Sequence, residues 1–148
     1  MKPSLHKKKL SKAIENKKTE ITSEDQAVFK ELESFLGNFN DEQKKAIVSQ
    51  AKKILCIAGA GSGKTSVLTK RIEFLVKYKG VDPIKILAIT FTRKARREME
   101  HKLEKLGIAK VHVETFNSFS EKILKQYGHI IYGKPTRVIG FQEKLFLM

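Results

Sequence analysis

The sequence predicts an α/β fold in which parallel strands alternate with the helices that cover them. Three short apolar runs, at residues 53–57, 84–90 and 110–114, have the length and composition of buried strands. Each run is followed by apolar residues at helical spacing, and successive strand–helix–strand units place parallel strands in one sheet. With 148 residues, of which 41% are hydrophobic, the chain is long enough for one domain with a core.

The first 22 residues are predicted to be a basic flexible arm, and residues 23–148 the domain. The arm is polar and Lys-rich, and its apolar residues lack a sustained period. Residues 1–20 carry seven lysines against two glutamates, a charge of +5, and the rest of the chain carries +9 of the net +14. A polyanion is therefore expected as partner, with nucleic acid preferred to an anionic membrane surface. A merely solvated Lys-rich surface is the alternative, and it suits the arm better than the body.

Two helices are expected between the arm and the first strand. Ser23 and Gln26 resemble a capping box that opens a helix, and Gly37 followed by Asn38 ends it. Asn40 is the expected N-cap of the second helix. The apolar face of the first helix is expected to hold Val28, Leu32, Phe35 and Leu36.

The later helices are delimited by the same kind of signal. The helix behind the first strand is expected to end near Tyr78, and Gly107 ends the helix behind the second strand. A further helix follows the third strand, and residues 128–135 are expected to form a loop. The segment from Phe141 is apolar.

Cysteine content and hydropathy favour a cytoplasmic protein. Cys56 is the single cysteine, and its place in the first apolar run favours a buried, structural thiol. One cysteine allows no internal disulfide, which suits a reducing compartment. No apolar stretch approaches the ~18–20 residues that span a bilayer, so no membrane partner is expected.

A glycine-rich segment between the first strand and its helix carries the strongest chemical signal. Its glycines let backbone N–H groups turn toward an anion, and the helix N-terminus adds its dipole at the same point. Lys64 is expected to reach the β- and γ-phosphates of ATP, and Thr65 to ligate Mg²⁺. A plain turn would need neither three glycines nor the Gly-Lys-Thr ending. The candidate nucleotide-binding residues of this segment are Ala58, Gly59, Ala60, Gly61, Ser62, Gly63, Lys64, Thr65 and Ser66.

Three further motifs lie on the two sides of this segment: Phe-Asn-Asp-Glu-Gln at residues 39–43, Thr-Phe-Thr-Arg at 90–93 and Thr-Phe-Asn at 115–117. In order and spacing they resemble the motifs of superfamily 1 helicases of the UvrD/Rep type. The family commonly begins its loop with Ala, as at Ala58, where the general loop pattern has Gly. The resemblance covers residues 39–124 and is greatest to the helicase IV branch. It implies an incomplete RecA-like P-loop NTPase domain of an ATP-dependent DNA helicase that moves 3′-to-5′.

The resemblance also implies roles for individual residues. Gln43 would read the adenine edge, although a capping or surface glutamine is the simpler interpretation without the fixed spacing. Phe91 would stack on a base of single-stranded DNA at ~1–3 kcal/mol, and a core position at the strand end is an equal alternative. Thr115 would bind a phosphate, cap the following helix, or do both. The candidate DNA-binding residues are Phe91, Thr92, Arg93, Thr115 and Asn117.

The chain departs from the family pattern at three of its motif positions. Arg93 and Arg96 stand where Asn and Ala are usual, and Asn117 stands where His is usual. The two arginines add positive charge where a phosphate would pass. For Arg97, Lys102 and Lys105 a solvated helix face is the favoured interpretation.

Two catalytic parts of such an enzyme are missing from the sequence. Hydrolysis needs a carboxylate for Mg²⁺ and water, and positive charge on the γ-phosphate. After Thr115 the only acids are Glu121 and Glu143, and neither stands in an Asp-Glu context at a strand end. The chain is therefore expected to be the N-terminal part of a helicase, completed in cis or in trans by a second RecA-like domain. A non-catalytic ATP- and DNA-binding fragment and, less favoured, a small P-loop kinase are the alternatives.

Overall fold

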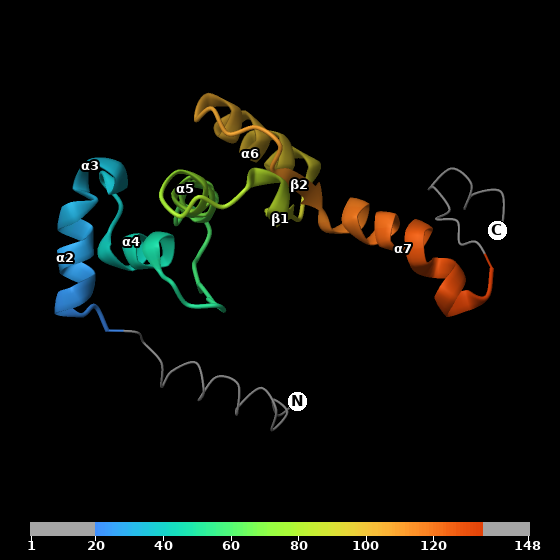
Figure 1. Cartoon of the computed structure of the whole chain (residues 1–148), viewed down its shortest axis with the longest axis horizontal. Coiled ribbons are helices and arrows are strands. Elements are labelled where there is room, and N and C mark those ends of the chain that lie inside the picture. Colours follow the sequence, from blue (N-terminus) through green and yellow to red (C-terminus); the bar gives the residue numbers. More distant parts are fainter. Residues whose placement is uncertain (1–19, 135–148) are drawn as a thin grey trace, which may run out of the picture. The chain divides into compact units, whose positions relative to one another are not determined.

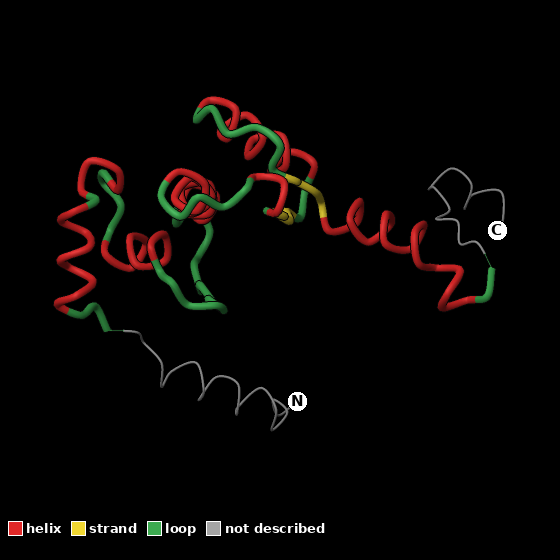
Figure 2. Tube along the Cα trace, in the orientation of Figure 1, coloured by secondary structure: helices red, strands yellow, loops and turns green. Residues whose placement is uncertain are grey.

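The structure is a computed structural model that describes residues 20–134 of the chain. The predicted arm, apart from its last three residues, and the apolar segment from Phe141 lie outside the described residues. The chain divides into two compact units, Met1–Cys56 and Ile57–Met148, and each is described by itself. Figure 1 gives the order of the elements, and Figure 2 shows which residues are helix, strand or loop.

The first unit is helical and opens with a capping box. Within residues 20–56 its helices are α2 (Ser23–Glu31), α3 (Glu33–Leu36) and α4 (Asp41–Val48). The Thr22 hydroxyl accepts from the Asp25 N–H at 3.2 Å, and the Asp25 carboxylate accepts from the Thr22 N–H at 2.9 Å. The box therefore lies one residue before the predicted pair, Ser23 and Gln26, because a carboxylate at Asp25 can reach back to the N-cap.

The other boundaries of this unit follow the sequence signals. Asn40 caps α4 as expected, and its side chain accepts from the Gln43 N–H at 2.9 Å. Gly37 ends α3 with a positive φ of 56°, which favours glycine. The predicted apolar face is partly wrong, since Val28 is exposed and its neighbour Phe29 is buried. Among the described residues of this unit, the buried apolar ones are Phe29, Leu36, Ile47 and Val48.

The second unit is an α/β arrangement around two parallel strands, β1 (Leu87–Thr90) and β2 (His112–Thr115). The strands pair from Leu87 opposite His112 to Thr90 opposite Thr115, so both end at the same edge of the sheet. The helical elements described in this unit, up to residue 134, are α5 (Lys64–Lys77), η1 (Pro83–Lys85), α6 (Arg93–Lys105) and α7 (Phe116–Tyr132). The parallel α/β class predicted from the sequence is confirmed for this unit.

The core of the second unit joins α5 and α6 to the sheet. Each element contributes apolar side chains that are at most 5% exposed. The strands give one inward residue each, and α6 gives two residues spaced by one helical turn. The buried cluster consists of Ile72, Ala88, Met99, Leu103, Ile108 and Val113. It fixes where β1, β2 and the starts of the following helices lie.

The predicted first strand is not formed. Residues 53–57 are irregular and exposed, with Leu55 at 78% and Ile57 at 70% exposure (Figure 2). A strand needs a partner for its N–H and C=O groups, and the two-stranded sheet of residues 20–134 does not include this segment. For the same reason Cys56 is exposed, and the expectation of a buried thiol is wrong.

The remaining strands and the last helix differ in length from the prediction. The run at residues 84–90 begins as the 3₁₀ turn η1, and within β1 Ala88 is buried while Leu87 and Ile89 are exposed. The expected loop at residues 128–135 is wrong for residues 128–132, because α7 continues to Tyr132; residues 133 and 134 are irregular as expected, and Pro135 lies outside the described residues. A single interior glycine costs only about 1 kcal/mol in a helix, and the left-handed ending comes later, at Gly133. No helix within residues 20–134 is both long and apolar enough to cross a membrane.

Candidate nucleotide-binding and nucleic-acid-binding sites

The glycine-rich segment forms a closed turn ahead of α5. The Ser62 hydroxyl donates to the Gly59 carbonyl at 2.8 Å, which closes the turn. Gly61 and Gly63 have φ angles of 74° and 77°, in the left-handed region that disfavours other residues. The glycines at these two positions are therefore required by the backbone, which supports the interpretation of a loop shaped for a ligand.

Lys64 and Thr65 stand at the start of α5, directly behind this turn. The Lys64 ammonium donates to the Ala58 carbonyl at 3.3 Å and also to the Gly59 carbonyl, so it lies over the loop. The Thr65 carbonyl accepts from the Thr69 hydroxyl at 2.8 Å, which holds this residue in a regular helical turn. An ammonium that can contact phosphate and a hydroxyl that can ligate Mg²⁺ are thus adjacent at one helix start.

The start of α5 is open in a way that suits an anion. Its N-cap, Gly63, has no side chain to cap the helix, and the first turn contains no acid. The first N–H groups of a helix carry a partial positive charge that caps and acids normally neutralise. An anion such as a phosphate would fill that role here.

The two predicted DNA-binding segments leave the ends of the paired strands. Since Thr90 lies opposite Thr115, the turn after β1 and the start of α7 are neighbours at the carboxyl edge of the sheet. The Thr90 hydroxyl lies 3.2 Å from the Thr92 carbonyl and 3.4 Å from the Glu114 carbonyl, so it links both segments. Ligands of α/β sheets bind at this edge.

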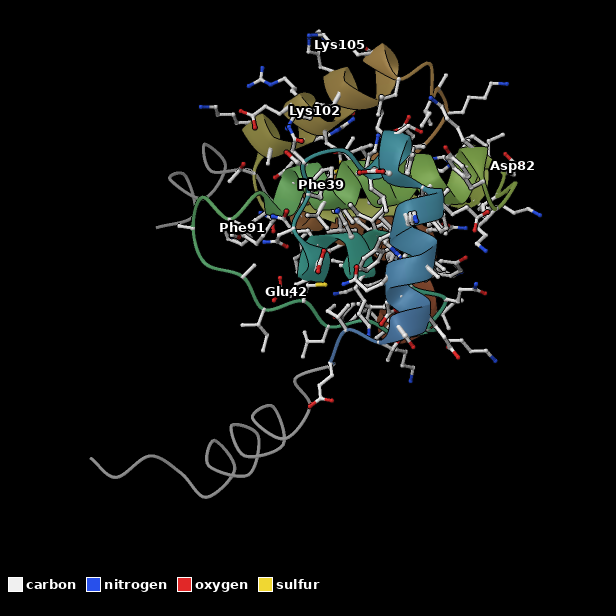
Figure 3. All side chains as sticks on the ribbon, turned by 90° about the vertical axis from the view of Figure 1, so that its left-hand side faces the viewer. Phe39, Glu42, Asp82, Phe91, Lys102 and Lys105 are labelled. Atoms are coloured by element: carbon white, nitrogen blue, oxygen red, sulfur yellow. The ribbon has the colours of Figure 1, made fainter. Side chains whose placement is uncertain are left out.

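Phe91 is the most exposed large apolar residue described, at 91% exposure (Figure 3). The alternative that it is a core residue at a strand end is therefore wrong. Arg93 and Lys94 occupy the first turn of α6 and are exposed, and that turn contains no acid. Cations at this end oppose the helix dipole, and a bound anion would relieve that cost.

Thr92 and Thr115 are the N-caps of α6 and α7. The Thr92 hydroxyl accepts from the Ala95 N–H at 3.1 Å. The Thr115 hydroxyl accepts from the Ser118 N–H, also at 3.1 Å, so the capping interpretation of Thr115 is confirmed. Asn117 is exposed in the first turn of α7. Phosphate binding by these residues stays a prediction.

A cluster around Glu114 was not identified from the sequence. The Glu114 carboxylate, 9% exposed, accepts from the Ser118 hydroxyl at 2.7 Å and from the Lys122 ammonium, and lies 3.6 Å from the Arg96 guanidinium. Lys122, followed by Ser118, holds the pKa of Glu114 below its usual range against the effect of burial. The spacing of Glu114, Ser118 and Lys122, each four residues apart across a helix start, was the available signal.

Gln43 takes part in the capping box of α4. Its side-chain oxygen accepts from the Asn40 N–H at 3.1 Å, which confirms the capping interpretation. It belongs to the first unit, and the glycine-rich loop to the second, so contact of Gln43 with adenine stays a prediction. Lys102 and Lys105 are exposed on α6, as the interpretation of a solvated face requires (Figure 3).

A glycine-rich turn at a helix start and a basic strand edge with an exposed aromatic are typical of proteins that bind nucleotides and nucleic acids. The comparison with known families agrees. The model of the UvrD/REP helicase N-terminal domain matches residues 39–145, and this chain belongs to that family.

Several curated proteins are similar in sequence. A probable DNA helicase II homolog of Mycoplasma capricolum is 35% identical over 79% of this chain and 16% of its own length. The ATP-dependent DNA helicase PcrA of Staphylococcus aureus is 43% identical over 64% of this chain and 13% of its length. The ATP-dependent DNA helicase UvrD1 of Mycobacterium bovis is 41% identical over 68% of this chain and 14% of its own length. The chain therefore spans a small part of these relatives, and the narrower likeness to helicase IV stays a prediction.

Proposed function

We propose that this chain is the ATP-binding part of an ATP-dependent DNA helicase, built on an incomplete RecA-like P-loop domain. Residues 58–66 bind Mg·ATP, with Lys64 on the β- and γ-phosphates and Thr65 on the metal. The strand-end segments at residues 90–93 and 115–117 bind single-stranded DNA. Three named relatives are DNA helicases, two of them ATP-dependent by name, which supports the proposal.

The observation that carries the proposal is the chemistry of three helix starts. The first turns of α5, α6 and α7 contain no acid, and each begins at a segment predicted to bind phosphate. In α5 the start lacks any side-chain cap, and in α6 two cations occupy it. Helix starts without acids, one of them directly after an exposed aromatic, fit a ligand that combines phosphates with stackable bases.

In the whole protein, ATP would lie between this domain and a second RecA-like domain. This chain would bind and orient the triphosphate, whereas the acid that positions water and the arginine that stabilises the γ-phosphate would come from elsewhere. Closure and opening of the two domains would move the protein 3′-to-5′ along one DNA strand. A cytoplasmic location remains part of the proposal.

The test is nucleotide binding measured beside DNA-stimulated phosphate release, both on the 148-residue chain. The chain should bind a fluorescent ATP analogue in the presence of Mg²⁺ and release little phosphate, with or without single-stranded DNA. A folded chain that binds no nucleotide contradicts the proposed site. Strong DNA-stimulated release contradicts the assignment of the missing groups, because another carboxylate such as Glu121 would then serve the metal.

The same experiment separates the helicase from a fragment whose only role is to bind. An Asp-Glu motif encoded directly downstream of residue 148 would supply the missing acid and favour the helicase. A small P-loop kinase would instead transfer phosphate to an acceptor without any dependence on DNA.

A further inference from the structure

We propose that Arg96 and Lys122 form a phosphodiester-binding subsite at the edge where β1 and β2 end, and that Glu114 is the residue that positions them. The inference rests on the proposed binding of single-stranded DNA at this edge. It adds a contact outside the predicted motif residues, since Lys122 lies beyond the segment at residues 115–117.

The geometry brings three elements together on one carboxylate. Glu114 is in β2, Arg96 in the first turns of α6, and Lys122 on α7, two turns beyond the strand. The Glu114 Oε1 accepts from Lys122, and its Oε2 accepts from the Ser118 hydroxyl at 2.7 Å and lies 3.6 Å from the Arg96 Nη1. Both cations are thereby held at the ends of neighbouring strands, although they come from different helices.

Exposure at this point keeps the two cations accessible to an anion, although Glu114 and Glu100 balance their charge. The carboxylate is 9% exposed, whereas the side chains of Arg96 and Lys122 are 39% and 67% exposed. The cations therefore present their outer sides to solvent while the acid between them lies inside. The Arg96 Nε also donates to a second acid, Glu100, at 2.9 Å along α6, which fixes the guanidinium further but leaves Lys122 as the more open donor.

The subsite adjoins the predicted stacking residue. Thr90 is the last residue of β1, and Phe91 follows it directly. The Thr90 hydroxyl lies 3.4 Å from the Glu114 carbonyl. A DNA strand that stacks a base on Phe91 must pass its phosphates along this same edge. A phosphodiester held by an arginine and a lysine beside a stacked base is the chemistry that this arrangement recognises.

The experiment is a salt titration of single-stranded DNA binding, with Arg96→Gln and Lys122→Gln compared against Lys85→Gln and Lys105→Gln in the full chain. Lys85 lies at the opposite end of β1, and Lys105 at the far end of α6, and both are exposed. All four variants remove one charge and keep the basic arm, so a polylysine effect cancels. The affinity K falls with salt, so the slope of log K against log salt is negative. Each subsite variant should reduce the steepness of this slope by about 0.7, which means roughly eightfold weaker binding at 50 mM and threefold at 200 mM salt.

Glu114→Gln tests the positioning role, because it raises the net charge by one. Simple charge counting predicts tighter DNA binding. Loss of positioning predicts weaker DNA binding and a less steep dependence of log K on log salt. Adding Arg96→Gln to Glu114→Gln should then reduce the steepness of the salt dependence little further. A purely structural role of Glu114 would instead lower the melting temperature and leave the salt slope unchanged, and that result overturns its positioning role.

Equal slopes for the subsite and control variants, in a wild-type chain that binds DNA, overturn the subsite alone. A folded wild-type chain without affinity for single-stranded DNA overturns the proposed DNA binding, and the subsite with it. The assignment is supported if the salt dependence of DNA binding is less steep for both subsite variants than for both control variants, and if the thermal transitions of all variants match that of the wild type.

Discussion

The helix starts of the two units differ in charge. In the first unit, α2, α3 and α4 all begin with acids in their first turn, and α2 and α4 also have complete capping boxes. In the second unit, α5, α6 and α7 begin without any acid, although Thr92 caps α6 and Thr115 forms a capping box at α7. The backbone dipole therefore meets acidic side chains at the helix starts of the first unit and none at those of the second.

We interpret this difference as one between helices that serve only the fold and helices that are also proposed to meet a ligand. A helix that needs only stability is improved by an acid at its start, at about 0.3–1 kcal/mol. The three helices α5, α6 and α7 lack this stabilising acid, and each follows a glycine-rich loop or a strand end. Such a lack is expected where a bound phosphate supplies the negative charge. The five predictions below test this comparison, from the largest expected effect to the smallest.

Lys64→Ala should weaken binding of Mg·ATP by about 1.5–3 kcal/mol, because it removes a charge-assisted contact at the most open of the helix starts. A titration with a fluorescent ATP analogue measures the loss. Lys79→Ala, beyond the last turn of the same helix, removes the same charge and should leave the affinity unchanged. If both variants fold and bind ATP like the wild type, the loop does not hold the phosphates through Lys64.

Phe91→Ala should weaken binding of single-stranded DNA by about 1–3 kcal/mol with little change in salt slope, because stacking is lost while phosphate contacts stay. Fluorescence anisotropy at several salt concentrations gives both quantities. Tyr78→Ala removes another exposed aromatic, at the end of α5, and is the matched control. A loss that appears equally in both variants would show that Phe91 has no specific role.

The sequence predicted the helix starts better than the sheet, for a physical reason. Caps and turns depend on residues three or four positions apart, so Asn40, Gly37 and the loop before Lys64 could be recognised locally. Strand formation depends on partners far along the chain. Residues 53–57 have a strand-like composition, yet within the described residues they have no strand to pair with, and they stay irregular.

The candidate sites divide along the same line. The glycine-rich loop and the two strand-end segments were predicted because each is a contiguous motif. The Glu114 cluster was missed because Arg96 reaches Glu114 only after α6 and β2 have packed together. The exposure of Phe91 could not be decided from sequence either, since an aromatic at a strand end is compatible with a core or a surface position.

Thr22→Ala should lower the free energy of unfolding by about 1 kcal/mol, because the capping box of α2 loses its hydroxyl acceptor. Thermal unfolding followed by circular dichroism measures this loss. Binding of ATP and DNA should be unchanged, since this helix start is neutralised by the chain and serves only the fold. If Thr22→Ala weakens binding of ATP or DNA and leaves the stability unchanged, the start of α2 does not serve only the fold, and the proposed difference between the two units is wrong.

The same capping box should also give the first unit a pH signature. The Lys45 ammonium, 2.6 Å away, and the Thr22 N–H lower the pKa of Asp25 from 3.8 to about 2. Because the pKa is lower in the folded state, ionised Asp25 stabilises the fold above pH 3.8, and this contribution is lost as the pH falls toward 2. The stability difference between wild type and Asp25→Asn should therefore shrink over that window, and a constant difference would show that the charge plays no part.

Lys94→Glu should change stability and DNA binding in opposite directions, and it has the smallest expected effect on stability. An acid in the first turn of α6 complements the helix dipole, so unfolding should become less favourable by about 0.3–1 kcal/mol. DNA affinity should fall, because the acid occupies the end proposed for a phosphate. Lys30→Glu makes the same charge change in the last turn of α2, where it should lower stability and affect DNA less. If both variants weaken DNA binding equally, only net charge matters, and the acid-free start of α6 has no role in binding.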